Sequence, residues 1–272
     1  MKICNDDPLI QVVRDDFGAT PLRVPDSRFR PGAVIANPQT KGRQARFWGN
    51  ISHVLPEFSE PQIVESPITQ VSRVSTGSIG VSLGLKVLDG LLSGMGLAMP
   101  IQDIQAEIGL ENAKEISLRF PSPRRRFMHL AQVGAGLEKL VLEKHGGTEL
   151  FYESDYSLVF VDGVLETREL RVDARTEREI SLSAGTAPLS ADLTAKWDQH
   201  GSITFESTEP VPFAFTAVSL DLDVATGALS IEPKFEMSEA VGSAPGFAPM
   251  PPKRILLAQP DELFVSSLLD EI

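Results

Sequence analysis

Few residues of this 272-residue chain have side chains suited to covalent or acid–base chemistry, and their spacing does not favour it. The only cysteine is Cys4, and the four histidines are His53, His129, His145 and His200. A cysteine nucleophile needs a rigid pocket and a paired base, and we expect neither so close to the first residue. No two histidines lie four residues apart, and no HExxH, GxSxG, Walker A or Rossmann GxGxxG pattern occurs. We therefore expect that the protein is not an enzyme.

A single thiol also limits the structural chemistry. It excludes an intramolecular disulfide and a zinc site built from cysteines, so we expect no metal. Only three residues precede Cys4, and the second is lysine. The sequence therefore predicts no secretory or lipoprotein signal and no N-myristoylation, and it favours the cytoplasm.

The charge of the chain bears on its partners. A net charge of -12 argues against nucleic acid, because phosphate binding depends on lysine and arginine. Membrane affinity would then require a local patch or an attached lipid. One candidate patch is Arg124, Arg125 and Arg126, which is either a solvated loop or a contact for anionic headgroups worth about 1 kcal/mol per residue. The same two interpretations apply to a second cluster, Lys41, Arg43 and Arg46.

The first hundred residues predict two helices with an extended region between them. Residues 7–16 form a short amphipathic pattern that begins at Asp7 and Pro8 and ends at Gly18, and residues 60–77 read as extended. The apolar, glycine-rich stretch 78–98 is nearly long enough to span a bilayer. Lys86 and Asp89 would each cost roughly 2.5–3.5 kcal/mol there. We therefore expect a buried helix of a soluble fold.

Beyond residue 100 the apolar pattern has period two, which is typical of strands. We expect a hairpin about the dipeptide Asp162-Gly163 and a strand with a bulge near Ala217. The expected strands are 116–120, 149–161, 165–174, 191–197, 202–207 and 211–224. The pattern predicts an α+β fold, with a twisted, largely antiparallel β-sheet and surrounding helices.

The C-terminal part differs in composition. Residues 241–252 contain glycine and proline and no charge, which is typical of an exposed linker. Residues 253–272 contain a short apolar run followed by an amphipathic helix that begins at Pro260. The sequence thus divides into a body (1–240), a linker (241–252) and a terminal peptide (253–272).

The order of several N-terminal residues resembles the bacterial gasdermins. The matching residues are Cys4, Asp7, Pro8, Ile10, Gly18, Arg23, Val24, Pro25, Phe29 and Pro31. The glycine-rich stretch 79–96, the following strand 113–120 and the apolar tail after a linker also resemble this family. Asp26 and Gly32 depart from the family pattern.

The resemblance implies a gasdermin N-terminal-domain-like fold with a short inhibitory C-terminal peptide. It implies a cytoplasmic, monomeric, autoinhibited protein of antiphage defence, which a protease activates. The released body would assemble into a large ring and form a β-barrel pore in the bacterial inner membrane. It further implies a palmitoyl group on Cys4, with no other cofactor.

Two further sets of site residues follow from these expectations. Candidate cleavage positions are Lys253 or Arg254 for a trypsin-like protease and Glu239 for an acidic-specific one. The inhibitory contacts would come from the apolar residues of the tail: Ile255, Leu256, Leu257, Phe264, Val265, Leu268 and Leu269. A tethered peptide acts at a millimolar effective concentration, and its release to a concentration a thousandfold lower costs about 4 kcal/mol of docking. The other interpretation of the tail is a permanent helix of the core.

Alternatives remain for the body as well. The alternating runs 63–75, 102–120 and 149–182 suit membrane strands, although their charges suit a pore lumen and a solvated loop equally. A soluble acyl- or lipid-binding module would use the glycine-rich helix to line a pocket. A small holin-like protein would span the membrane with residues 78–98, against which Lys86 and Asp89 argue.

Overall fold

The protein is described here from a computed structural model. The structure describes residues 13, 17–22, 28–39, 45–68, 71–76, 88, 92, 113–152, 156–176, 185–188, 193–197 and 202–231. The strands within this part are β1 (Thr20–Pro21), β2 (Ala33–Pro38), β3 (Arg46–Asn50), β4 (Val64–Pro67), β5 (Val71–Thr76), β6 (Ala113–Phe120), β7 (Arg124–Phe127), β8 (Tyr156–Thr176), β9 (Gly185–Pro188), β10 (Leu193–Trp197), β11 (Ser202–Leu222) and β12 (Leu229–Ile231). The helices are α2 (Ile51–Val54), α5 (Leu130–Leu137) and α6 (Glu149–Tyr152).

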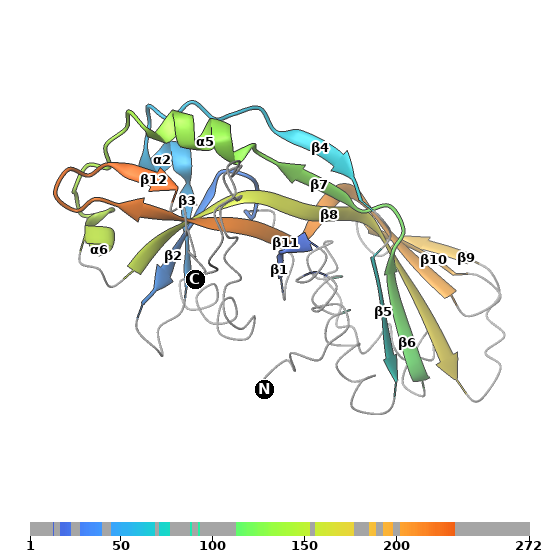
Figure 1. Ribbon diagram of the computed structural model, residues 1–272. Coiled ribbons are helices and arrows are strands. Elements are labelled where there is room, and N and C mark those ends of the chain that lie inside the picture. Colours follow the sequence, from blue (N-terminus) through green and yellow to red (C-terminus); the bar gives the residue numbers. More distant parts are fainter. Residues whose placement is uncertain are drawn as a thin grey trace, which may run out of the picture.

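Two strands of 21 residues each, β8 and β11, organise the fold. They pair antiparallel and run through the whole described part of the molecule (Figure 1). The central order of the sheet is β3-β2-β8-β11-β10-β9, and the described strands pair antiparallel throughout. This arrangement confirms the predicted largely antiparallel sheet.

The sheet has two halves that share these long strands. Figure 1 shows β2, β3, β12 and the three helices at one end, and β5, β6, β9 and β10 at the other. Along the edge away from β11, β8 pairs first with β2 through Tyr156 to Phe160, then with β7 through Gly163 to Glu166, and then with β6 through Arg171 to Thr176. We call the half that contains β5, β6, β9, β10 and the adjoining parts of β8 and β11 the finger half, and the other the head.

A waist separates head from finger half. There the register between β8 and β11 shifts between Glu206 and Val211, opposite Glu169 and Thr167. Pro210 lies in this stretch, and a proline cannot donate a hydrogen bond to the ladder. The side chain of Thr167 instead accepts a hydrogen bond from the backbone N–H of Glu169, at 3.1 Å. The regular pairing of the two long strands is therefore interrupted where the sheet changes partners.

The head has a conventional core beneath its helices. Val133 and Leu137 of α5 and Ile51 of α2 are buried against Phe160 and Val218 of the two long strands. None of the described helices is both long and apolar enough to cross a membrane.

The predicted hairpin about Asp162-Gly163 is wrong, because both residues lie inside the uninterrupted strand β8. Thr216 pairs with Gly163 and Ala217 pairs with Val161, so Asp162 is an extra residue in the ladder. A β-bulge uses the same residue types as a tight turn, and the dipeptide marks such a bulge here. The bulge that the sequence placed near Ala217 is thus confirmed, with the extra residue on the partner strand.

Three other predictions need correction at their boundaries. Residues 149–152 form the helix α6, so the strand predicted over 149–161 begins only at Tyr156. The strands predicted over 202–207 and 211–224 are one strand, which ends at Leu222. It ends there because Asp223 accepts hydrogen bonds from the N–H of Ala225 and the hydroxyl of Thr226, which stabilise a turn.

Several predicted elements agree with the structure. The β10–β11 hairpin pairs Trp197 with Ile203, and Gly18 has a φ of 55°, a backbone conformation that favours glycine. The helices predicted over 7–16 and 78–98 lie outside the described residues, apart from Val13, Leu88 and Leu92. These three are helical and fully buried.

Candidate functional site

The finger half is a sheet with one apolar and one polar face. Side chains alternate between the two faces along each strand because the strand period is two. The residues of the apolar face are buried: Leu118, Phe120, Leu170, Val172, Leu193, Ala195, Ile203 and Phe205. The residues of the polar face are Ser117, Arg119, Glu169, Arg171, Asp173, Thr194, Lys196, Ser202, Thr204 and Glu206.

Helical residues cover the apolar face. Leu88 and Leu92 are fully buried and belong to the same hydrophobic cluster as the apolar face, and so does Val13. Burial of one leucine side chain contributes about 1.5–3 kcal/mol. The sheet therefore keeps its apolar face from water by contact with segments distant in the sequence.

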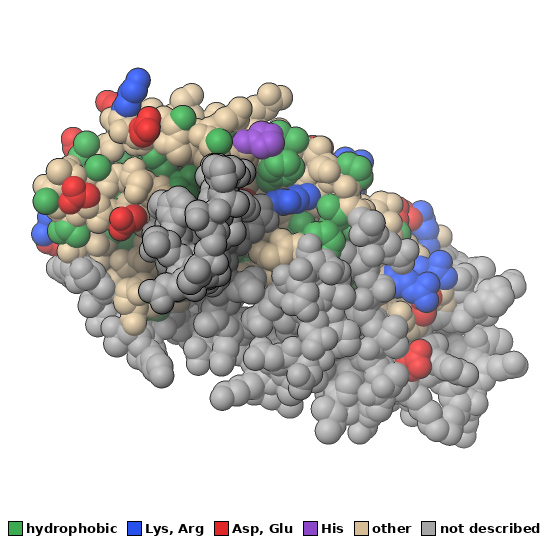
Figure 2. Space-filling model, viewed as in Figure 1, with side chains coloured by type: hydrophobic (Ala, Val, Ile, Leu, Met, Phe, Trp, Pro, Cys, Tyr) green, Lys and Arg blue, Asp and Glu red, His purple; other side chains and the backbone are tan. Residues whose placement is uncertain are grey.

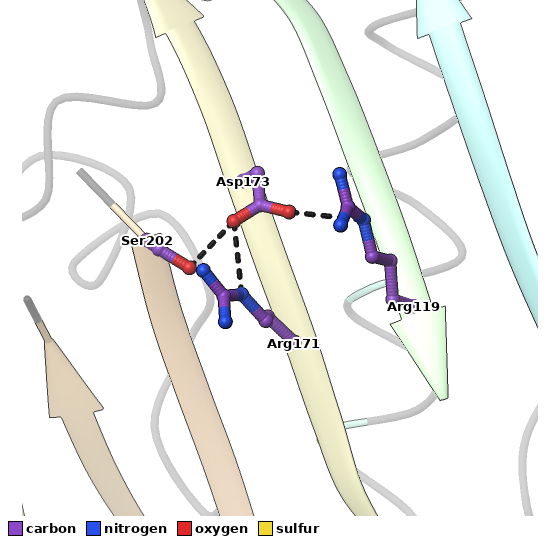
Figure 3. Close-up of polar contacts among 4 residues, drawn as sticks. All are labelled: Arg119, Arg171, Asp173 and Ser202. Atoms are coloured by element: carbon purple, nitrogen blue, oxygen red, sulfur yellow. Dashed lines mark hydrogen bonds and ion pairs between the residues drawn. The ribbon is translucent and has the colours of Figure 1, made fainter. Parts of the chain in front are cut away.

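On the polar face, one carboxylate connects three strands (Figure 3). The Oδ1 atom of Asp173 in β8 accepts hydrogen bonds from the hydroxyl of Ser202 in β11, at 2.5 Å, and from Nε of Arg171, at 3.1 Å. Its Oδ2 atom lies 3.2 Å from Nε of Arg119 in β6. Arg119 and Arg171 are directly opposite each other in the ladder, an arrangement that is unfavourable for like charges without a neutralising group.

A second ion pair lies on the same face. The ammonium group of Lys196 in β10 lies 2.6 Å from the carboxylate of Glu206 in β11. Both side chains are exposed, so the pair contributes little to stability. The pair has no net charge, because one lysine offsets one glutamate.

The three arginines of β7 have different surroundings. Arg124 is 63% exposed and lies 3.9 Å from Glu65 of β4, whereas Arg126 is 31% exposed and lies 3.4 Å from the same carboxylate. The guanidinium of Arg125 lies over the ring of Phe127, 4.7 Å from its centroid. Arg124 is thus the most exposed ion-paired arginine of the strand. On the face that Figure 2 shows, the described basic side chains form small separate groups among acidic ones.

Glu166 of β8 is the buried member of this network. Its carboxylate lies 3.6 Å from Arg126. Burial raises the pKa of Glu166, and the neighbouring charge of Arg126 opposes that shift only in part. Both residues line a polar cleft of about 230 Å³ at the waist, together with Ser122, Arg168 and Pro210.

Most of the site residues predicted from sequence lie outside the described residues. These are Cys4, Glu239, Lys253, Arg254 and the tail residues Ile255, Leu256, Leu257, Phe264, Val265, Leu268 and Leu269. Within the part that the structure describes, no three histidine, cysteine, aspartate or glutamate side chains gather as a metal site would require.

Comparison with known proteins decides the family. The model of the bacterial gasdermin family matches residues 22–228, which is most of the chain. The chain belongs to the bacterial gasdermin family. The resemblance that the N-terminal motifs indicated is therefore confirmed.

One solved structure supports the fold of this gasdermin. A bacterial gasdermin from Bradyrhizobium tropiciagri aligns with a TM-score of 0.56 and 18% identity, over 83% of this chain and 90% of that one. The cryo-EM structure of the gasdermin A3 membrane pore aligns with a TM-score of 0.40 and 12% identity, over 85% of this chain and 96% of that one. No curated protein sequence matches. The α+β, gasdermin-like fold expected from sequence is confirmed.

Sequence reasoning did not identify the Asp173 cluster of this gasdermin. The alternation of Glu169, Arg171 and Asp173 along one strand indicates a solvated face, but it does not reveal a partner. Arg119 lies more than fifty positions earlier, and only the register of β6 against β8 brings it to Asp173.

Proposed function

We propose that this gasdermin is an autoinhibited pore-forming protein that acts by assembly in a membrane and not by catalysis. The observation that supports the proposal best is the two-faced sheet of the finger half, whose apolar face is covered by separate helical residues. A membrane strand needs one face for lipid and one for water, with its backbone groups paired to neighbouring strands. The strands β6 and β8 meet both requirements once the cover leaves.

The length of the strands is consistent with this role. A strand crosses the hydrocarbon core with about 9–11 residues when it is tilted. β6 has eight residues, just under this range, and β8 continues past the waist to Thr176. Both belong to runs whose alternation is compatible with membrane strands. We propose that these strands contribute to the wall of a large β-barrel formed by a ring of protomers.

We propose that residues 253–272 are the inhibitory segment of the protein. In this hypothesis the peptide holds the body (1–240) in its monomeric state, and a protease cuts in or beside the linker (241–252). Lys253, Arg254 and Glu239 are the candidate positions. Cleavage removes the high effective concentration that the covalent tether gives the peptide, and the peptide then dissociates from the body. The apolar residues of the tail supply the docking energy.

Lipid attachment and headgroup contacts would favour the membrane after cleavage. A palmitoyl chain on Cys4 contributes about 0.8 kcal/mol per buried CH₂, yet a single acyl chain anchors a protein only reversibly. Of the β7 arginines, Arg124 has the exposure that a headgroup contact requires. The protein would be cytoplasmic while locked and would act at the bacterial inner membrane, as a cell-killing step of antiphage defence.

The test is dye release from liposomes of bacterial lipids, with full-length protein that carries an engineered protease site within residues 242–252. We expect release only after cleavage. The same protein without the engineered site, treated with the same protease, is the control. A confirmed cut without release would contradict the pore and favour a soluble acyl- or lipid-binding module.

A cellular test distinguishes the effect of the inhibitory peptide from that of the acyl group on Cys4. A truncation that ends near Gly242 should be toxic to a bacterial host in which the full-length protein is tolerated. Adding Cys4→Ala should reduce this toxicity. Equal toxicity of the two truncated proteins would show that the thiol is dispensable.

A further inference from the structure

The Asp173 cluster combines two positive charges and one negative charge on the polar face of the finger half. Arg119, Arg171 and Asp173 are each partly exposed, at 46%, 44% and 27% of their side-chain surface. The nearby ion pair of Lys196 and Glu206 is neutral as a unit. The cluster therefore has a net charge of +1, and it would be +2 without the carboxylate of Asp173.

We propose that Asp173 sets the ion selectivity of the pore, because it neutralises one of two arginine charges on the face that borders the conducting path. This inference rests on the proposed function. The opposite side chains, Leu118 and Val172, are fully buried and apolar, and a lipid-facing surface consists of such side chains. The polar face must then border water.

The register of the strands would preserve the cluster when the sheet moves. Arg119 pairs directly with Arg171, and Asp173 lies two residues further along the same face of β8. Strands β6 and β8 are hydrogen-bonded neighbours, and moving them together breaks none of their shared ladder. The contacts of Asp173 with Arg119 and Arg171 need only this pair of strands. The bond to Ser202 additionally depends on β11.

The ionic strength determines the distance over which these wall charges act on ions. Screening confines the effect of a wall charge to about 10 Å at 0.1 M salt, and extends it to about 30 Å at 0.01 M. In a wide pore the wall charge therefore influences a larger share of the lumen at low salt than at high salt. Each protomer of a ring repeats the same cluster, so a change of one charge per chain changes a whole ring of charge.

The test uses the full chain with the engineered linker site, cleaved and added to planar bilayers under a tenfold KCl gradient whose dilute side is near 0.01 M. The reversal potential is measured for wild type, Asp173→Asn and Arg171→Gln. Relative to wild type, we expect Asp173→Asn to shift it toward the chloride equilibrium potential and Arg171→Gln to shift it toward that of potassium. Both shifts should shrink at high salt.

A matched control separates wall charge from total charge. Glu138→Gln removes an exposed carboxylate at the end of α5 in the head, and it should leave the reversal potential unchanged. If Asp173→Asn fails to assemble, Arg119→Gln joins Arg171→Gln and should shift the potential in the same direction. Conducting variants with the wild-type reversal potential at low salt would overturn the inference. Cleaved wild-type protein without any conductance would refute the pore itself.

Discussion

The carboxylate of Glu166 is buried in the sheet 3.6 Å from the guanidinium of Arg126, which also contacts Glu65. Burial penalises the ionised form of Glu166, so its pKa is raised above 4.5 despite the neighbouring cation. The folded protein therefore binds this proton more tightly than the unfolded chain. The contribution of Glu166 to stability is fully present below about pH 4.5, and it is lost as the pH rises through the raised pKa.

Glu166→Gln tests this pH dependence. Glutamine has no charge to desolvate, and Arg126 keeps Glu65 as a partner. We expect the free energy of unfolding of the variant, relative to wild type, to increase as the pH rises from about 4 toward neutrality. Urea unfolding at a series of pH values measures this difference. A difference that is constant with pH would show that Glu166 titrates as it does in the unfolded chain.

Asp223→Asn should show the opposite dependence. The hydroxyl of Thr226 and the N–H of Ala225 donate to this carboxylate, which lowers the pKa of Asp223 below 3.8. Its contribution to stability is present above that value and is lost as the pH falls through the lowered pKa. The variant should therefore be less stable than wild type near neutral pH and approach it in acid. The same urea series provides the measurement.

Gly163→Ala should destabilise the protein by about 1–3 kcal/mol, because there is no space for a methyl group. A Cβ at this position would lie 2.8 Å from the hydroxyl oxygen of Thr216 and 3.0 Å from Cβ of Phe127. Adding Thr216→Ala should recover part of the loss. Gly146→Ala is the matched control, since a Cβ there has no neighbour within 4 Å. Chemical denaturation compares the four proteins. Equal stability of Gly163→Ala and Gly146→Ala would contradict the close packing around Gly163.

Gly163 also illustrates how much of the fold was predictable from the sequence. Local patterns predict strands such as β6 and β10, the bulge near Ala217 and the end of a helix at Gly18. These features depend on the hydrophobic period, on turn-forming residue types and on φ preferences, which are all properties of residues close together in the sequence. The Asp-Gly dipeptide was misread because a turn and a bulge have the same local requirements. The close packing of β7 against Gly163 distinguishes them, and it is visible only in three dimensions.

The candidate site was less predictable for the same reason. The three arginines of β7 are evident in the sequence, but the partners Glu65 and Glu166 come from two other strands. Both the alternation of β8 and the apolar character of residues 78–98 were recognised. That Leu88 and Leu92 share one hydrophobic cluster with β8 could not be inferred from either pattern alone.

Leu88→Ala should loosen the cover of the apolar face. A buried leucine-to-alanine change costs about 2–5 kcal/mol, and here the cost falls on the contact that covers the apolar face of the sheet. Under the proposed function, we expect faster dye release after cleavage than for wild type. Leu137→Ala in α5 is the control, because it opens a comparable cavity in the separate core of the head. Similar acceleration by both variants would indicate general destabilisation instead of a specific cover.

Arg124→Gln should weaken binding of the cleaved protein to anionic vesicles by several-fold, as expected for about 1 kcal/mol per basic residue near the surface. Glu65→Gln should strengthen the binding, because it removes the carboxylate next to Arg124 and Arg126. Vesicle co-sedimentation measures both effects. Neutral vesicles should show neither, and unchanged binding of both variants to anionic vesicles would exclude this strand as a headgroup contact.

The shared use of β8 and β11 has a consequence for synthesis on the ribosome. Thr20 pairs with Phe215 and Val34 pairs with Phe160, so these early strands wait for partners that lie more than a hundred residues later in the chain. Pairings between such distant segments form slowly, and unpaired strand edges promote aggregation in the meantime. The nascent chain thus has β1 without its partner, and β2 with only β3 as a neighbour, until β8 and β11 are synthesised. We expect its yield in cells to depend strongly on translation rate and on chaperones that shield β2 and β8.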